Sequence, residues 1–477
     1  MFAKIQRVHF VGIGGIGMSG IAEVLLNLGY KVSGSDLRQS AVTARLASLG
    51  AAIREGHNAE NVTGAEVVIV SSAVRADNAE IIAAHEQHIP VIQRAEMLAE
   101  LMRLKYGIAI AGMHGKTTTT SMVAAVLAAG GLDPTVVVGG RVDAMGSNAR
   151  LGKSHYLVAE ADESDRSFLK LSPILAVVTN IDREHMDCYR DMEDVEQTFL
   201  RFMNSVPFYG MVVACNDNDE LRRLLAGVRR RTLSYGVRED SDFRISNLRC
   251  GASKQTAALS RFQVSYREKD LGEFELQVPG AHNVANATAA IAVGIGLDMP
   301  VDEIRRALAS FNGVDRRFQL IGSADGVTVI DDYGHHPTEI RATLAAARQC
   351  GFERVHVIFQ PHRYTRTQLL LDEFATAFRD ADSVLVLDIY PASEPPIPGI
   401  TSEMLANRIT EDGGQEALYV SSFAEAVTLA SEAANSGDMI LTLGAGSIWQ
   451  LGSQVLEQLQ SRTARVSGSA GMKATPS

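Results

Sequence analysis

The chain has 477 residues, of which 46% are hydrophobic and 21% charged, so it is too long for one compact core and typical of a folded multidomain protein. Its 45 Lys and Arg residues and 56 Asp and Glu residues give a formal net charge of −11, which argues against nucleic acid as the main partner because no broad basic field can offset phosphates. Four scattered cysteines, the lack of a secretory leader pattern and the lack of an apolar run of about 18 residues predict a cytoplasmic protein with free thiols and no membrane insertion.

The first hundred residues alternate short apolar runs with amphipathic stretches. Strands are expected over 7–14 (RVHFVGIG), 30–36 (YKVSGSD) and 66–74 (EVVIVSSAV), with helical patterns between them. Strands that alternate with helices predict a parallel sheet built from right-handed crossovers. We therefore expect a Rossmann-like domain over 1–105.

A glycine loop stands between the first expected strand and its helix. It contains Gly12, Gly14, Gly15 and Gly17, and Asp36 lies where a ribose-binding acid sits in dinucleotide folds. Such a loop brings bare backbone to a diphosphate at a helix N-terminus. Both NAD and a UDP-sugar carry that diphosphate, so the loop alone leaves the nucleotide open.

The pattern restarts near Tyr106 with a strand, a second glycine loop and an Ala-rich helix. The loop, GMHGKTT, has the GK[ST] ending of a P-loop without its full span. In such a loop backbone N–H groups cradle phosphates, Lys116 offsets charge between the β and γ groups, and the Thr117 hydroxyl binds Mg²⁺. The loop predicts an ATP site with Mg²⁺ or Mn²⁺. Its expected ATP-binding residues are Gly112, Met113, His114, Gly115, Lys116, Thr117 and Thr118.

Acidic clusters follow the next two expected strands, at 160–165 (EADESD) and 182–187 (DREHMD). Because the carboxyl ends of parallel strands meet at one edge of a sheet, at least one of these carboxylates is expected to hold the metal. The stretch 231–279 alternates apolar and polar residues, which predicts a small antiparallel insert. We expect these features to form a P-loop ATPase-like domain over 106–314.

The last third returns to strand-plus-loop units, which predict a second Rossmann-like domain over 315–460 and a disordered tail over 461–477. Two of its expected strands end in DDYGHHP and PHRYTR. Arg363 and Arg366 in the second motif are suited to clamping a carboxylate or a phosphate.

Eight motifs occur in a fixed order along the chain: GIGGIGMSGIAE, SGSD, GMHGKTTTT, EADESD, TNIDREHMD, AHNVANATAA, DDYGHHPTEI and PHRYTRT. Together they resemble the Mur ligases of peptidoglycan synthesis, and within that family the branch that adds L-alanine. The resemblance implies three α/β domains, for a UDP-sugar, for ATP and for an amino acid. It implies ATP-dependent ligation of L-alanine to the lactyl carboxylate of UDP-N-acetylmuramate through an acyl phosphate, giving UDP-N-acetylmuramoyl-L-alanine, ADP and phosphate.

The resemblance also implies roles for individual residues. The catalytic positions are Lys116, Glu160 and His185, and the metal positions are Thr117, Glu160 and His185. Asn283 and Asn286 match positions that contact ATP. The UDP-sugar positions are Gly12, Gly14, Gly15, Gly17, Ser35, Asp36 and Ser71. The L-alanine positions are Tyr333, His335, Arg363 and Arg366.

The chain departs from several Mur ligases in one respect. Those relatives hold a second metal with a carbamylated lysine, but no lysine occurs between Leu171 and Ser253. The coordination of a second metal, the base for the alanine ammonium and the oligomeric state therefore stay open. Three other functions share part of these features: a murein-recycling ligase that adds a tripeptide to the same UDP-sugar, an NAD-dependent oxidoreductase, and a non-enzymatic nucleotide-binding regulator.

Overall fold

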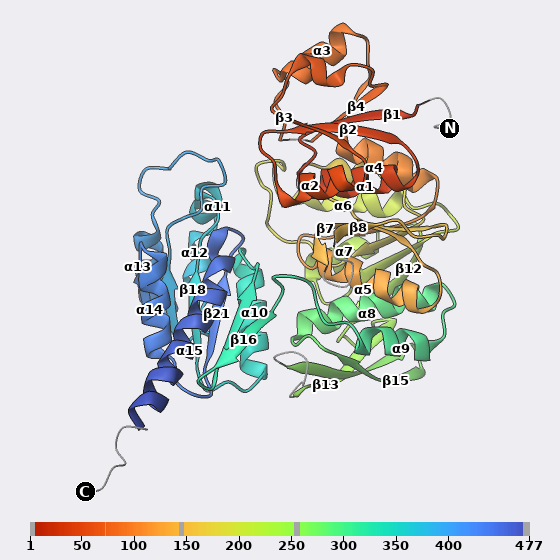
Figure 1. Ribbon diagram of the computed structural model, residues 1–477. Helices are drawn as coiled ribbons and strands as arrows, with labels where there is room; N and C mark the ends of the chain where they lie inside the picture. The colour runs from red at the N-terminus through yellow and green to blue at the C-terminus, as the bar shows by residue number, and fades with distance from the viewer. Residues whose placement is uncertain (1–4, 72, 143–146, 252–257, 471–477) are drawn as a thin grey trace, which may run out of the picture. The chain divides into compact units, whose positions relative to one another are not determined.

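The computed structural model describes residues 5–71, 73–142, 147–251 and 258–470. The chain divides into two compact units. The first unit comprises Met1–Ser246, Gln263–Phe274 and Ala285–Ser310, and the second comprises Asn247–Phe262, Glu275–Val284 and Phe311–Ser477. The described residues form three sheets flanked by helices (Figure 1), which confirms the predicted three-domain α/β architecture.

The N-terminal sheet has the strand order β3-β2-β1-β4-β5, and all its pairs are parallel. Its elements are β1 (Arg7–Val11), α1 (Ile16–Asn27), β2 (Lys31–Asp36), α2 (Ala41–Ser48), β3 (Ala52–Glu55), β4 (Val67–Val70), α3 (Ala79–Glu86), β5 (Val91–Gln93) and α4 (Arg94–Arg103). Helix α3 covers one face, opposite α1, α2 and α4 (Figure 1). The strand order reverses between β1 and β4, where open α/β sheets bind ligands, and the first glycine loop lies at this point.

The central sheet has the order β15-β14-β13-β12-β11-β10-β6-β9-β7-β8. Its strands are β6 (Tyr106–Ala111), β7 (Thr135–Val142), β8 (Ser147–Arg150), β9 (Tyr156–Glu160), β10 (Leu175–Val178), β11 (Met211–Cys215), β12 (Arg231–Gly236), β13 (Phe243–Gly251), β14 (Leu259–Tyr266) and β15 (Lys269–Leu276). The associated helices are α5 (Lys116–Ala129), η3 (Ser167–Lys170), α6 (Met192–Asn204), α7 (Asp219–Leu225), α8 (Ala281–Gly296) and α9 (Val301–Ala309). The second glycine loop connects β6 to α5.

The antiparallel insert is smaller than the sequence predicts. Strand β12 was expected to belong to it, but β12 pairs in parallel with β11 and buries Leu233 and Tyr235. Its alternating pattern arises because one face of this parallel strand is less covered than the other. Strands β14 and β15 are neighbours joined by a two-residue turn, which requires antiparallel pairing.

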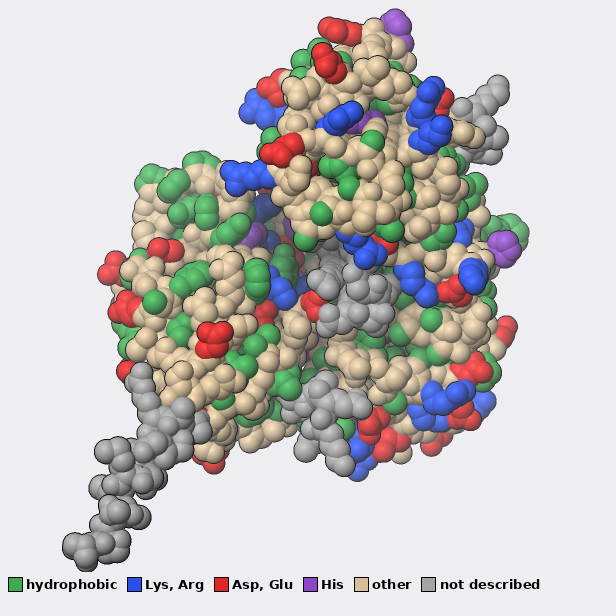
Figure 2. Space-filling view, viewed as in Figure 1, with side chains coloured by type: hydrophobic (Ala, Val, Ile, Leu, Met, Phe, Trp, Pro, Cys, Tyr) green, Lys and Arg blue, Asp and Glu red, His purple; other side chains and the backbone are tan. Residues whose placement is uncertain are grey.

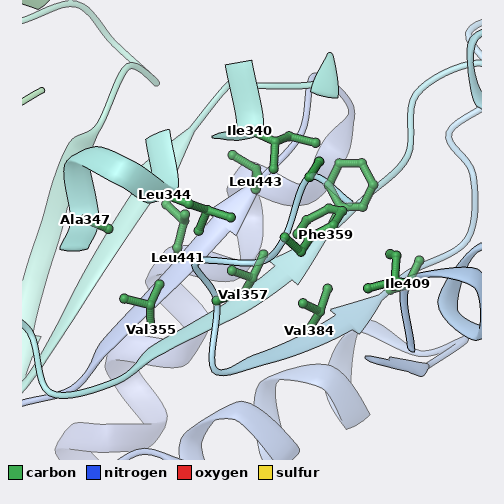
Figure 3. Packing of buried hydrophobic residues seen from close by; sticks show 14 of the residues in the cluster. Ile340, Leu344, Ala347, Val355, Val357, Phe359, Val384, Ile409, Leu441 and Leu443 are labelled. Atoms are coloured by element: carbon green, nitrogen blue, oxygen red, sulfur yellow. The ribbon is translucent and has the colours of Figure 1, made fainter. Parts of the chain in front are cut away.

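The C-terminal sheet has the order β16-β17-β21-β18-β19-β20 and is parallel apart from the antiparallel β16–β17 pair. Its strands are β16 (Gln319–Ala324), β17 (Val327–Asp332), β18 (Val355–Phe359), β19 (Ser383–Val386), β20 (Ala417–Tyr419) and β21 (Met439–Leu443), and its helices are α10 (Pro337–Gln349), α11 (Tyr364–Leu369), α12 (Leu371–Ala375), α13 (Ser402–Gly413), α14 (Phe423–Ala433) and α15 (Gln450–Ala470). Alternate residues of β18 face opposite layers. Val357 and Phe359 pack with Leu344 of α10 (Figure 3), whereas Ile358 packs with Leu451 of α15.

The predicted disordered tail is wrong for its first ten residues, because α15 continues through Ala470. Arg462 anchors the start of this segment, because its guanidinium pairs with Asp325 and donates to the backbone oxygens of Ser431 and Ala434. These contacts join residues 137, 31 and 28 positions apart in the sequence, so local composition could not show them. Residues 471–477 lie outside the described residues.

The surface agrees with the acidic composition. On the face shown in Figure 2, basic and acidic side chains are mixed over the first unit, the second unit shows mainly scattered acidic side chains, and the described residues of this face form no broad basic field. Among the described helices, none is both long and apolar enough to cross a membrane.

Candidate active site

The second glycine loop is fixed to the end of the neighbouring strand β10. Gly112 and Gly115 have φ angles of 131° and 81°, and a Cβ on Gly112 would lie 2.0 Å from Thr179 Oγ1. The Thr179 hydroxyl donates to His114 O at 2.6 Å, and Asn180 Oδ1 accepts from His114 N at 2.9 Å. The loop is therefore held in one conformation that only glycine at 112 permits.

Lys116 turns back over this loop. Its Nζ donates to Gly112 O at 2.7 Å, to Met113 O at 3.2 Å and to Glu163 Oε1 at 2.7 Å. Burial alone would lower the pKa of Lys116, but the carboxylates of Glu163, Glu184 and Glu160 raise it above its ordinary value. The ammonium therefore stays charged beside the backbone of the loop.

Glu163 is the carboxylate that the structure places against the lysine. Its side chain is fully buried, and burial raises its pKa to about 7 against the opposing effect of Lys116. Glu163 Oε2 is buried and makes no hydrogen bond among the described residues. His185 Nε2 lies 3.6 Å from Glu163 Oε1 and 3.9 Å from Glu184 Oε1. The two acidic clusters thus meet beside the loop, as the strand-end argument predicted.

The expected metal and ATP residues are distributed around this centre. Thr117 is the second residue of α5, and Glu160 ends β9 close enough to influence the pKa of Lys116. Asn286 of α8 lies against the loop, since a Cβ on Gly115 would be 2.8 Å from Asn286 Oδ1. Asn283 instead donates its Nδ2 to Pro279 O at 2.8 Å.

His114 has a partner that the sequence did not identify. Its Nε2 lies 2.9 Å from Asp182 Oδ2, and its Nδ1 lies 3.8 Å from Glu184 Oε2. Both acids belong to the DREHMD motif, so this pair connects the glycine loop with the second acidic cluster. The motif placed these residues near the loop, but only the fold shows which acid faces the imidazole.

The first glycine loop is supported by strand β2. Gly12 N and Ile13 N both donate to Ser35 O at 2.9 Å, and Gly14 N donates to Asp36 Oδ2 at 2.8 Å. Asp36 therefore fixes the loop backbone instead of extending away from it toward a ribose. Gly15 is exposed and precedes α1, so its backbone is open to a ligand.

The Ser35 side chain lies in a buried polar network. Its Oγ donates to Glu80 Oε2 at 2.7 Å and lies 3.0 Å from His57 Nδ1, while His9 Nε2 lies 3.2 Å from Glu80 Oε2. This network supports the loop from behind, and Ser35 contributes its backbone oxygen to the loop. Ser71, at the end of β4, is partly exposed.

In the second unit, aromatic rings from the two predicted motifs gather at the ends of β17 and β18. The ring centroids of Tyr333 and His335 are 5.3 Å apart, those of His335 and His362 are 5.8 Å apart, and His362 stacks on Tyr390 at 5.5 Å. His335 Nδ1 lies 3.1 Å from Tyr333 O, an acceptor, so this nitrogen carries the proton. Burial and the neighbouring His335, Arg366 and Arg363 lower the pKa of His362 to about 3, which keeps its ring neutral.

The two expected arginine anchors have different surroundings. Arg366 Nη1 lies 3.2 Å from His362 Nδ1, at the edge of the ring cluster. Arg363 is more exposed, and its Nη1 lies 3.9 Å from Glu394 Oε1. The structure therefore places Arg366 within the cluster and Arg363 at its rim.

Sequence reasoning missed a charged group around Tyr333. The guanidinium carbons of Arg316 and Arg317 lie 5.0 and 5.2 Å from the Tyr333 ring centroid, and Arg317 Nη1 donates to Glu339 Oε1 at 3.3 Å. Burial raises the pKa of Asp332 to about 6, although two backbone N–H groups donate to it. The RR dipeptide precedes β16, and no local spacing connected it with the later motif.

Comparisons with known proteins agree over nearly the whole chain. Residues 7–106 match the family description "Mur ligase family, catalytic domain", residues 110–294 "Mur ligase middle domain" and residues 316–446 "Mur ligase, glutamate ligase domain". Curated UDP-N-acetylmuramate–L-alanine ligases of Koribacter versatilis and Acidobacterium capsulatum are 71% and 64% identical to this chain. Each alignment covers 97% of this chain and 99% of the relative.

Solved structures of Mur ligases also match this chain. UDP-N-acetylmuramate-alanine ligase MurC of Thermotoga maritima matches with a TM-score of 0.79 at 31% identity, over 96% of this chain and 99% of that one. A murein peptide ligase of Psychrobacter arcticus shares the fold, with a TM-score of 0.67 at 24% identity over 95% and 99% of the two chains. The motifs, the sheets and these matches together show that the chain belongs to the Mur ligase family.

Proposed function

We propose that this protein is an ATP-dependent ligase that joins L-alanine to the lactyl carboxylate of UDP-N-acetylmuramate, the first peptide step of peptidoglycan precursor synthesis. The observation that carries the proposal is the 71% identity, over 97% of the chain, to a curated UDP-N-acetylmuramate–L-alanine ligase. The lysine-bearing loop supports the ATP-dependent half of the reaction, and the arginine-rich ring cluster supports the amino-acid half.

The chemistry has two steps. A lactyl carboxylate oxygen attacks the γ-phosphorus of ATP, which gives an acyl phosphate and releases ADP. The deprotonated amine of L-alanine then attacks the acyl carbon, and the tetrahedral intermediate expels inorganic phosphate to leave the amide. Lys116 offsets the negative charge that grows between the β- and γ-phosphates in the first step.

A divalent cation fits the residues beside the loop. Mg²⁺ prefers oxygen ligands, and the Thr117 hydroxyl and the Glu160 carboxylate are of this kind. The buried Glu163 Oε2, which has no hydrogen-bond partner among the described residues, is a further oxygen suited to a cation. When bound, Mg²⁺ or Mn²⁺ would neutralise phosphate charge; His185, a nitrogen donor beside Glu163, would complete the site more weakly.

The three parts of the chain take separate substrates in this proposal. Residues 1–105 would bind the UDP-sugar through the first glycine loop, residues 106–314 would bind ATP, and residues 315–460 would bind L-alanine through Tyr333, His335, Arg363 and Arg366. Arg366 or Arg363 would hold the alanine carboxylate. ATP and nucleotide sugars are cytoplasmic metabolites, so we place the reaction in the cytoplasm.

The test is phosphate release from ATP and Mg²⁺ with UDP-N-acetylmuramate and different acceptors. Release that requires the UDP-sugar and is fastest with L-alanine, compared with glycine, L-serine and the murein tripeptide, supports the proposal. Faster release with the tripeptide would assign the protein to the recycling reaction instead. No release with any acceptor would leave a nucleotide-binding protein without this activity.

A further inference from the structure

Arg94 lies between the two glycine loops of the first unit. It is the first residue of α4, and its guanidinium covers Gly17 in the first turn of α1: a Cβ on Gly17 would lie 2.9 Å from Arg94 Nη1 and 3.3 Å from Arg94 Cζ. Another guanidinium nitrogen, Nη2, donates to Asp162 Oδ2 at 3.0 Å. Asp162 directly precedes Glu163, the partner of Lys116.

The first glycine loop needs a cation that its own residues do not supply. A diphosphate brings negative charge to the loop, and the Asp36 carboxylate already occupies Gly14 N at 2.8 Å. The second loop meets the same demand with Lys116. Arg94 is the cationic side chain that the structure places against the first loop, and a guanidinium suits two phosphate oxygens.

We propose that Arg94 binds the diphosphate of the UDP-sugar, exchanging Asp162 for the ligand's oxygens. The side chain of Arg94 is 22% exposed and that of Asp162 39% exposed, so a ligand can reach the pair and water already weakens it. The inference rests on the proposed function for the identity of the ligand. It adds a binding residue that the motifs of the first loop do not contain.

The competing explanation is that Arg94 only ties α4 to the segment after β9. A second link of that kind exists: Lys170 Nζ donates to Glu96 Oε1 at 2.6 Å and to Gln93 Oε1 at 2.7 Å. Lys170 makes this link without touching the glycine loop in the contacts that the structure describes. Lys170→Met is therefore a matched control that breaks a link to α4 and leaves Arg94 in place.

The experiment measures binding of UDP and of uridine to the full chain by calorimetry. We expect Arg94→Gln to weaken UDP binding about 10- to 100-fold, the range for a hydrogen bond to a charged group, and to leave uridine binding unchanged. Arg94→Lys should retain part of the affinity. Lys170→Met should change UDP binding by less than about twofold. Equal losses in Arg94→Gln and Lys170→Met, or equal losses for UDP and uridine, would overturn the proposal.

Asp162 provides the decisive second measurement. Asp162→Asn removes the internal competitor, so UDP should bind about two- to fivefold more tightly, and the gain should vanish in the Arg94→Gln background. A gain that persists without Arg94 would contradict the exchange. Wild-type protein that fails to bind UDP would count against the proposed function itself, whereas normal UDP binding that is insensitive to Arg94→Gln would refute this inference alone.

Gly17→Ala gives an independent probe that leaves the arginine in the chain. Gly17 does not have a positive φ, and alanine favours a helix over glycine, so the backbone accepts the change. The added methyl would displace the guanidinium from the loop. UDP binding should weaken as in Arg94→Gln, and the double variant should be no weaker than Arg94→Gln alone.

Discussion

The two glycine loops of the first unit occupy equivalent places, yet their charged partners are opposite. Each follows the carboxyl end of a central parallel strand and precedes a helix. In the first loop a carboxylate, Asp36, accepts from Gly14 N; in the second an ammonium, Lys116, donates to Gly112 O and Met113 O. A diphosphate that does not react can be held by backbone N–H groups together with a cation from a neighbouring element, whereas a phosphoryl group in transfer develops charge that needs a cation fixed within the loop itself. The difference therefore separates a binding loop from a reacting loop.

Replacing Lys116 of the second loop should have the largest effect, on the rate of phosphate release. We expect Lys116→Met to reduce phosphate release at least about 100-fold, because it removes the cation that stabilises charge in phosphoryl transfer, and to leave UDP binding unchanged. Initial rates of phosphate release and calorimetry with UDP measure the two effects. Lys105→Met is the control, since Lys105 Nζ donates to Ser154 O in the same unit. Comparable losses of UDP binding and of turnover would mean that the two loops do not act separately.

The second largest effect should be the pH dependence of ATP binding at the second glycine loop. The pKa of Glu163 is raised to about 7, so its carboxyl is mainly protonated below pH 7 and mainly ionised above it. Lys116 gains a full anionic partner as the pH rises, and ATP must displace that partner. We expect the Kd of ATP, measured without a divalent cation, to increase about three- to tenfold more from pH 6 to pH 8 in the wild type than in Glu163→Gln. The variant experiences the same titration of ATP itself, so parallel curves would contradict the assignment.

The sequence could predict most of this fold because buried parallel strands carry apolar runs and their helices carry periodic patterns. Strand β3 has four residues, as many as the predicted β4, but it is mostly exposed, and β5 has only three; the structure alone identifies both. The contact of Arg462 in α15 with Asp325 joins residues that lie far apart in the chain. Patterns that repeat locally were predictable, and contacts that depend on the completed sheet were not.

In the site, too, local motifs were predictable from the sequence and long-range contacts were not. The motif GKTT identified Lys116, but EADESD contains several carboxylates. The resemblance assigned Glu160 to the metal, which stays a prediction, and only the structure shows that Glu163 pairs with the lysine. The turn after β9 decides which acid faces inward. Likewise, the pairing of Arg317 with Glu339 depends on the closure of β16 onto β17, so residues that flank no motif escaped the sequence analysis. Motifs therefore locate a site, and the fold selects the side chains within it.

The role of Asp36 gives a smaller, sharper test of the first loop. Asp36→Ala removes the acceptor of Gly14 N and should weaken UDP binding about fivefold, the value of one hydrogen bond of about 1 kcal/mol. Asp36→Asn keeps an oxygen acceptor and should bind UDP almost as the wild type does. If the carboxylate instead accepted from the ribose 2′-hydroxyl, Asp36→Ala would cost no affinity for 2′-deoxy-UDP. Calorimetry with UDP and with 2′-deoxy-UDP distinguishes the two outcomes.

The smallest effect is expected from a methyl group added to the first loop. A Cβ on Gly15 would come no closer than 3.4 Å to another atom, and Gly15 has an ordinary φ of −61°, so Gly15→Ala should change the free energy of unfolding by less than about 0.5 kcal/mol. The same change at Gly112 combines a φ of 131° with a contact of 2.0 Å and should cost about 2–4 kcal/mol. Thermal unfolding measures both variants. Because Gly15 is exposed toward the place where the diphosphate would lie, Gly15→Ala should still weaken UDP binding while ATP binding is retained. A stable Gly15→Ala variant with unchanged UDP affinity would show that the diphosphate does not approach this part of the loop. The first glycine loop could then no longer be compared with the second as a diphosphate-binding loop.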